Sequence, residues 1–97
     1  MHARVATFEG EERGPEYEEQ MARIRTELER GNRPPGLEDA TGVLILSGEG
    51  GRRMAITLFE TEEGMLRGDA ALNEMTPVGM GQRTSVEFYD VAVMDMR

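Results

Sequence analysis

The chain has 97 residues, no cysteine, 19 acidic residues against 11 basic ones and a formal net charge of −8. This length encloses one hydrophobic core, so we expect a single domain over residues 1–97. The missing cysteine excludes disulfides and thiolate metal sites, and the acidic excess argues against a nucleic-acid partner. No apolar run approaches the roughly 18 residues of a membrane span and no apolar leader is present. We therefore expect a cytoplasmic protein with no membrane partner.

The first third of the chain predicts a strand and then an amphipathic helix. Residues 2–9 alternate in the manner of a strand. Gly14-Pro15 is typical of a helix start, and Gly31 is typical of the residue just after a helix. Between them, apolar residues at steps of four, three and four share one helix face: Tyr17, Met21, Ile24 and Leu28. Pro34-Pro35-Gly36 then predicts a loop.

A hairpin follows this loop. Residues 42–47 are a continuous apolar run and predict a second strand, and residues 52–60 predict a third. The glycine-rich segment 48–51 between them is a strong turn signal.

The last part of the chain predicts another helix and a final strand. Thr61 is a good N-cap, and apolar or small residues then recur at steps of three, four and three: Met65, Gly68, Leu72 and Met75. Gly68 falls on the apolar face, where it would permit close approach to a sheet. Thr76-Pro77 is expected to end this helix, residues 78–81 to form a loop, and residues 83–94 to form the last strand.

A short pattern marks both strand-to-helix junctions. Phe8-Glu9-Gly10-Glu11-Glu12 reappears as Phe59-Glu60-Thr61-Glu62-Glu63. This placement indicates a βαβ unit used twice. We therefore predict an α+β, ferredoxin-like βαββαβ fold, in which a four-stranded antiparallel sheet carries both helices on one face.

Both faces of this sheet are apolar in the sequence. Residues 43–46 put two large aliphatic side chains on each face of one strand, and residues 54–59 do nearly the same on the next. Two helices cover only one face, and soluble monomers seldom expose a large apolar patch. We therefore expect a homodimer formed by sheet-to-sheet packing. The alternative is a face of mixed character with ordinary exposed apolar residues.

Four segments resemble the antibiotic biosynthesis monooxygenase-like (ABM) family. They are residues 3–8, residues 35–37, residues 54–63 and residues 86–93. The resemblance spans most of the chain and implies a dimeric α/β barrel. It also implies a pocket between sheet and helices, where some members oxidise phenolic or quinol-type molecules with O₂ and no bound cofactor. Other members degrade haem, and many have no assigned activity.

Departures from the family pattern argue against haem degradation. The chain has no tryptophan, it carries Thr7 or a neighbour where the haem degraders use asparagine, and its one histidine is the near-terminal His2. We expect no cofactor and no metal site.

Cofactor-free oxygenation needs a group that deprotonates a phenol or enol, and donors that stabilise the anion. The candidate pocket residues are Arg4, Thr7, Tyr17, Asn73 and Tyr89. The candidates also have ordinary structural explanations. Core or interface packing alone would explain the placing of the tyrosines. Arg4 and Arg53 would then be strand arginines with solvated guanidinium groups, and Asn73 would be an exposed residue. No catalytic residue is assigned.

Two functions remain open at this point. The leading hypothesis is a small cofactor-independent monooxygenase that acts on an aromatic or quinol-like molecule. The alternative is a non-catalytic small-ligand-binding or stress-associated module.

Overall fold

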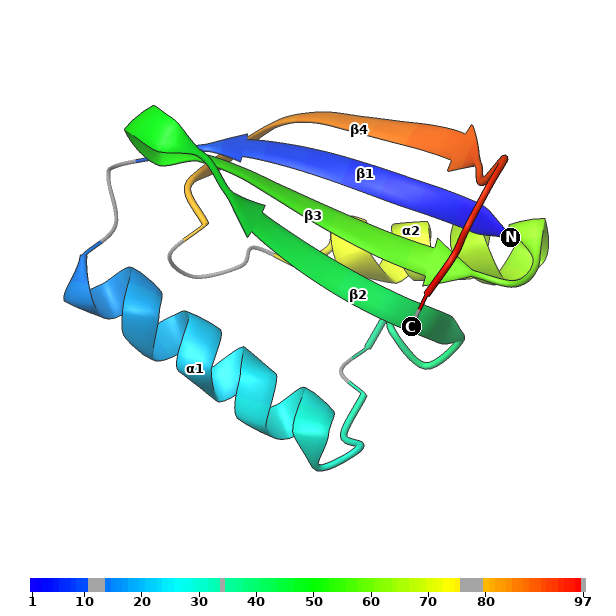
Figure 1. The fold of residues 1–97 in the computed structure, drawn as a ribbon, viewed down its shortest axis with the longest axis horizontal. Coiled ribbons are helices and arrows are strands. Elements are labelled where there is room, and N and C mark those ends of the chain that lie inside the picture. Colours follow the sequence, from blue (N-terminus) through cyan, green and yellow to red (C-terminus); the bar gives the residue numbers. More distant parts are fainter. Residues whose placement is uncertain (11–13, 34, 76–79, 97) are drawn as a thin grey trace.

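The chain folds in the order β-α-β-β-α-β, as the sequence predicts (Figure 1). The computed structural model describes residues 1–10, 14–33, 35–75 and 80–96. The strands and helices are β1 (His2–Glu9), α1 (Pro15–Glu29), β2 (Ala40–Ser47), β3 (Arg52–Phe59), α2 (Glu62–Asn73) and β4 (Gln82–Asp90), with a short 3₁₀ turn at Glu49–Gly51. The predicted hairpin is therefore confirmed.

The strands form one antiparallel sheet in the order β2-β3-β1-β4. The two central strands, β1 and β3, come from opposite halves of the chain, and each half contributes one edge strand. Both helices lie on the same side of this sheet (Figure 1). The ferredoxin-like α+β fold is thus confirmed.

The pairing register assigns the apolar residues to the two faces. Ala6 lies opposite Ala55, which in turn lies opposite Ile45, so these three share the face that carries the helices. One residue away in each strand, Val5, Ile56 and Leu44 are aligned on the other face. Because side chains alternate along a strand, the apolar run of β2 places large aliphatic groups on both faces.

Helix α2 packs closely on the sheet. Its first turn is capped by Thr61, whose hydroxyl accepts a hydrogen bond from the Gly64 amide at 3.0 Å, so the predicted N-cap is confirmed. Gly68 faces the fully buried ring of Phe59, and a Cβ built at Gly68 would stand 2.6 Å from the ring's Cζ. A side chain at this position would push the helix away, which is why glycine lies on the apolar face.

Helix α1 stands away from the sheet. It begins at Pro15 and ends just before Gly31, whose φ of 81° suits the residue after a helix. Tyr17 is its buried residue: the phenol hydroxyl is hydrogen-bonded to Ser47, and the Arg53 guanidinium lies 4.3 Å from the ring centre. Among the described residues, α2 packs against β1 and β3, whereas α1 has no comparable packing with any strand. The rest of the predicted apolar stripe is therefore only half-buried.

The prediction that the last strand continues to residue 94 is wrong. Strand β4 ends at Asp90, which pairs with His2, the first residue of β1. Past this pair, the Val91 amide donates a hydrogen bond to the Met1 carbonyl at 3.0 Å. The strand therefore ends where its regular pairing with β1 ends. In Figure 1 the C-terminal segment then passes in front of the sheet, whereas α2 lies behind it.

Some sequence-based expectations concern residues outside the described part of the chain. They are Glu11 and Glu12 of the first repeat copy, Pro34 of the proline loop, and residues 76–79 after α2. Over the ranges that are described, none of the helices has the length and apolar character needed to cross a membrane.

Candidate functional site

A cavity of about 660 Å³ lies between α1, the C-terminal end of α2 and the helix-bearing face of the sheet. It exists because α1 stands away from the sheet and because the strands below it carry small side chains, among them Ala6, Ala55 and Thr57. Ile24 and Leu28 face it from α1. Its volume is within the range that proteins use for small organic ligands.

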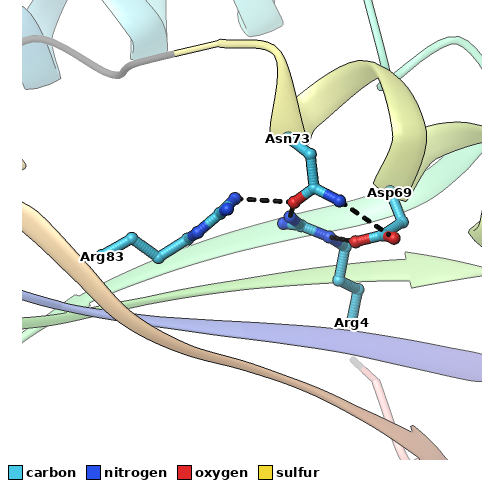
Figure 2. Close-up of polar contacts among 4 residues, drawn as sticks. All are labelled: Arg4, Asp69, Asn73 and Arg83. Atoms are coloured by element: carbon cyan, nitrogen blue, oxygen red, sulfur yellow. Dashed lines mark hydrogen bonds and ion pairs between the residues drawn. The ribbon is translucent and has the colours of Figure 1, made fainter.

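Three of the lining residues, Arg4, Asn73 and Arg83, belong to a polar cluster (Figure 2). It contains four residues from three elements, and we call it the arginine cluster: Arg4 from β1, Asp69 and Asn73 from α2, and Arg83 from β4. Arg4 Nε donates to Asp69 Oδ1 at 2.8 Å, and Arg4 Nη2 donates to Asn73 Oδ1 at 3.2 Å. Arg83 Nη1 donates to the same Asn73 oxygen at 2.7 Å.

The burial of Arg4 explains why its guanidinium group has hydrogen-bonding partners on α2. The expectation of a solvated guanidinium is wrong for Arg4 and for Arg53, which are only 3% and 4% exposed. A buried charge is tolerated only with partners, and Arg4 has the Asp69 carboxylate while Arg53 donates to the Met80 carbonyl at 3.3 Å. Asp69 is itself held by Asn73, one helical turn later, whose Nδ2 donates to Asp69 Oδ2 at 3.2 Å.

The structure brings together two of the five candidate residues that the sequence suggested. Arg4 and Asn73 both line the cavity and are hydrogen-bonded to each other. Tyr17 is buried at the start of α1 and is not among the described lining residues. Thr7 alternates with Arg4, Ala6 and Phe8, so it lies on the opposite face of the sheet.

Tyr89 also lies on the opposite face, paired with Ala3 of β1. Its hydroxyl donates to Glu87 Oε2 at 2.5 Å. This hydrogen bond, together with the negative charge of Glu87, raises the pKa of the Tyr89 phenol above its ordinary value. The position of Tyr89 on the opposite face keeps it remote from the cavity. Its raised pKa means that the phenol loses its proton less readily than an ordinary tyrosine.

The sequence did not anticipate the lining residues Arg83 and Thr57, nor Asp69, which forms an ion pair with Arg4. Asp69 and Asn73 are four residues apart on a predicted helix, and this spacing is a usable sign that they share a face. Nothing local marks Arg83 or Thr57, because only the strand register puts them beside residues distant in sequence.

The cavity can hold an apolar body and donate hydrogen bonds to an oxygen. Glu27 is the one carboxylate among its described lining residues, and it already accepts a hydrogen bond from Asn32 at 2.7 Å. No group of three or more potential metal-binding side chains occurs within the described ranges. The described lining thus offers apolar contacts and hydrogen-bond donors for a ligand, whereas its one carboxylate is already hydrogen-bonded.

No protein-family model matches the chain, and no curated protein is significantly similar to it. The ABM-like relationship therefore stays a prediction based on the sequence segments quoted above.

Proposed function

We propose that this protein is an ABM-like small-molecule-binding protein that holds a flat apolar ligand in the cavity between α1 and the sheet. One observation carries the proposal: the cavity of about 660 Å³ combines apolar walls with the arginine cluster. Binding sites for small organic molecules typically combine these two features, since the apolar wall supplies affinity and a few polar groups fix orientation.

Binding is favoured over catalysis because the described lining residues of the cavity include no evident base. A phenol or quinol must lose a proton before it can transfer an electron to O₂, and a positioned base would have to accept that proton. Glu27, the described carboxylate in the lining, belongs to the distant helix α1 and is engaged by Asn32. The arginine cluster donates protons in hydrogen bonds and accepts none through its guanidinium groups.

A pair of variants tests the binding site. Ala55 lies on the cavity floor, so Ala55→Phe should fill part of the cavity and abolish binding. Ala70 is exposed on α2 and outside the described lining, so Ala70→Phe is the matched control. A panel of quinols and polyphenols would be screened by thermal shift and titrated by calorimetry. Binding that survives Ala55→Phe, or no binding by any member of the panel, would contradict the proposal.

Cofactor-independent oxygenation is the second candidate. The arginine cluster favours it, because two guanidinium groups beside Asn73 would stabilise a phenolate or an enolate at the cavity wall. The same panel would be assayed for oxygen uptake with wild-type protein and Ala55→Phe. Uptake that requires an open cavity would establish oxygenation, whereas tight binding without uptake would exclude it for the panel.

We further propose that two copies pack through the sheet face opposite the helices. Leu44 and Leu46 on this face are 41% and 46% exposed. The C-terminal segment on the same side of the sheet exposes Val93 and Met96 as well, at 86% and 69%. A second copy is the occupant that fits, because an exposed apolar face can meet the same face of another copy across a two-fold axis.

Sedimentation equilibrium tests this dimer against the monomer mass of 10.8 kDa. Leu46→Arg should shift the protein toward monomer, because it would bury an unpaired charge in the interface. Leu66 is 51% exposed on α2, so Leu66→Arg is a matched control that should leave the mass unchanged. A wild-type protein that is monomeric at micromolar concentration would refute the proposal.

A further inference from the structure

We infer that the ligand of this cavity is an organic anion: an apolar body with a single acidic group, such as a carboxylate, that is received by Arg83 beside Asn73. The inference rests on the proposed binding function and adds the charge and chemical class of the ligand. It is carried by the charge balance of the cavity and by the geometry of the arginine cluster.

The cavity has the opposite charge balance from the chain as a whole. The chain has 19 acidic and 11 basic residues. The described lining of the cavity reverses this excess, with one acidic residue, Glu27, and four arginines: Arg4, Arg23, Arg33 and Arg83. Four arginines around an apolar cavity of a strongly acidic protein create a local site where a negative charge is stabilised.

Within the arginine cluster, one positive charge is left without a carboxylate. Asp69 compensates Arg4 through a hydrogen-bonded ion pair at 2.8 Å. Arg83, in contrast, donates to the neutral Asn73 oxygen, and among the described residues it has no carboxylate within ion-pair distance. The cluster of two guanidinium groups and one carboxylate therefore carries a net positive charge.

The two cations are also held close together. Arg4 Nη2 and Arg83 Nη1 both donate to Asn73 Oδ1, at 3.2 and 2.7 Å (Figure 2). Since both distances end on one oxygen, the two nitrogens are at most about 6 Å apart, where like charges repel appreciably. An anionic oxygen beside Arg83 would relieve this repulsion, and the guanidinium has further N–H groups with which to bind it.

The rest of the cavity limits the size and charge of this anion. Its lining also includes the apolar Ile24, Leu28, Leu72 and Val43. The two other arginines of the lining, Arg23 and Arg33, are exposed, and Arg23 has the Glu19 carboxylate at 3.7 Å. One acidic group at the cluster end with a flat apolar body beyond it fits this division. A polyanion would place additional charges against the apolar side chains, at a desolvation cost.

Two fluorescent probes with the same aromatic body test the inference. 8-Anilinonaphthalene-1-sulfonate carries one negative charge, and N-phenyl-1-naphthylamine lacks the sulfonate and is neutral. We expect wild-type protein to bind the sulfonate more tightly. Arg83→Gln should weaken the sulfonate about three- to tenfold and change the neutral probe less than about twofold, as expected for a partly exposed charge contact. Arg25→Gln removes an exposed arginine of α1 outside the described lining and should change neither.

A carboxylate competitor extends the test to the proposed ligand class. 1-Naphthoate should displace the sulfonate probe at lower concentration than 1-naphthalenemethanol, and added salt should reduce this difference. Equal affinity for the two probes, or an equal effect of Arg83→Gln on both, would overturn the inference. The binding function itself fails in a different way: in that case Ala55→Phe would leave both probes bound as in wild type.

Discussion

Replacing Gly68 by alanine should destabilise the protein, although alanine is the better helix former. A Cβ at Gly68 would stand 2.6 and 2.8 Å from Cζ and Cε1 of Phe59, and 2.8 Å from the Gly36 carbonyl oxygen. Ordinary contacts of this kind are about 3.4–4 Å, so α2 would have to move outward from the sheet. Neither neighbour yields easily, because the Phe59 ring is fully buried and the Gly36 oxygen belongs to the backbone.

Two opposing free energies decide the size of the effect. Glycine to alanine inside a helix favours folding by about 1 kcal/mol. Overpacking against a fixed core costs about 1–3 kcal/mol. Because two separate elements resist the new methyl group, we expect a cost in the upper part of this range, about 2–3 kcal/mol. We therefore expect Gly68→Ala to lower the free energy of unfolding by about 1–2 kcal/mol, which corresponds to a urea midpoint lower by roughly 0.5–1 M.

Urea unfolding followed by circular dichroism, at one fixed protein concentration, measures this difference. Ala70→Gly, at an exposed position of the same helix, measures the helix-propensity contribution without a steric one. Gly68→Ala should cost less in a Phe59→Leu background, because the ring atoms that it meets are then absent. A Gly68→Ala protein that is as stable as wild type, or more stable, would refute the steric argument.

Three further predictions concern the N-terminal cap of α2 and the two tyrosines. Thr61→Ala should cost about 1 kcal/mol of unfolding free energy by removing the cap on the Gly64 amide, and Thr61→Asp should restore most of it; thermal unfolding of both variants checks this. Glu87→Gln should move the ultraviolet titration of Tyr89 to lower pH, because Glu87 raises the pKa of that phenol; an unchanged titration would contradict the assignment. Tyr17→Ala should speed amide hydrogen exchange in α1 more than in α2, because Tyr17 anchors α1 to the sheet. An equal change of the exchange rate in both helices would show that α1 is held by other contacts.

The sequence was most informative where local chemistry determines structure. Strand alternation gave β1 its observed bounds, and the position of Gly31 marked the end of α1. Thr61 was identified as an N-cap because side-chain capping depends on residues only three apart. Gly68 was identified as a close-approach residue because it interrupts an otherwise apolar face.

The sequence was less informative where distant residues meet. Arg4 reads as an ordinary strand arginine until the sheet brings α2 above it and Asp69 within 2.8 Å. The last strand was placed four residues too long, because its end depends on where β1 begins and its own composition does not show this. The stripe on α1 predicted core packing, whereas the structure leaves space beneath most of it.

The sequence by itself determined the order of the elements, the ferredoxin-like fold and the apolar character of both sheet faces, because these follow from periodicity, caps and turns within a few residues. The tertiary structure decided that α1 leaves a cavity, that Arg4, Asn73 and Arg83 meet at its wall, and that Asp69 pairs with Arg4. Strand pairing joins His2 to Asp90, and helix docking joins Arg4 to Asn73, 69 positions away. The cavity and the net positive charge of the arginine cluster therefore exist only in the folded chain, once the sheet has formed and the helices have packed on it.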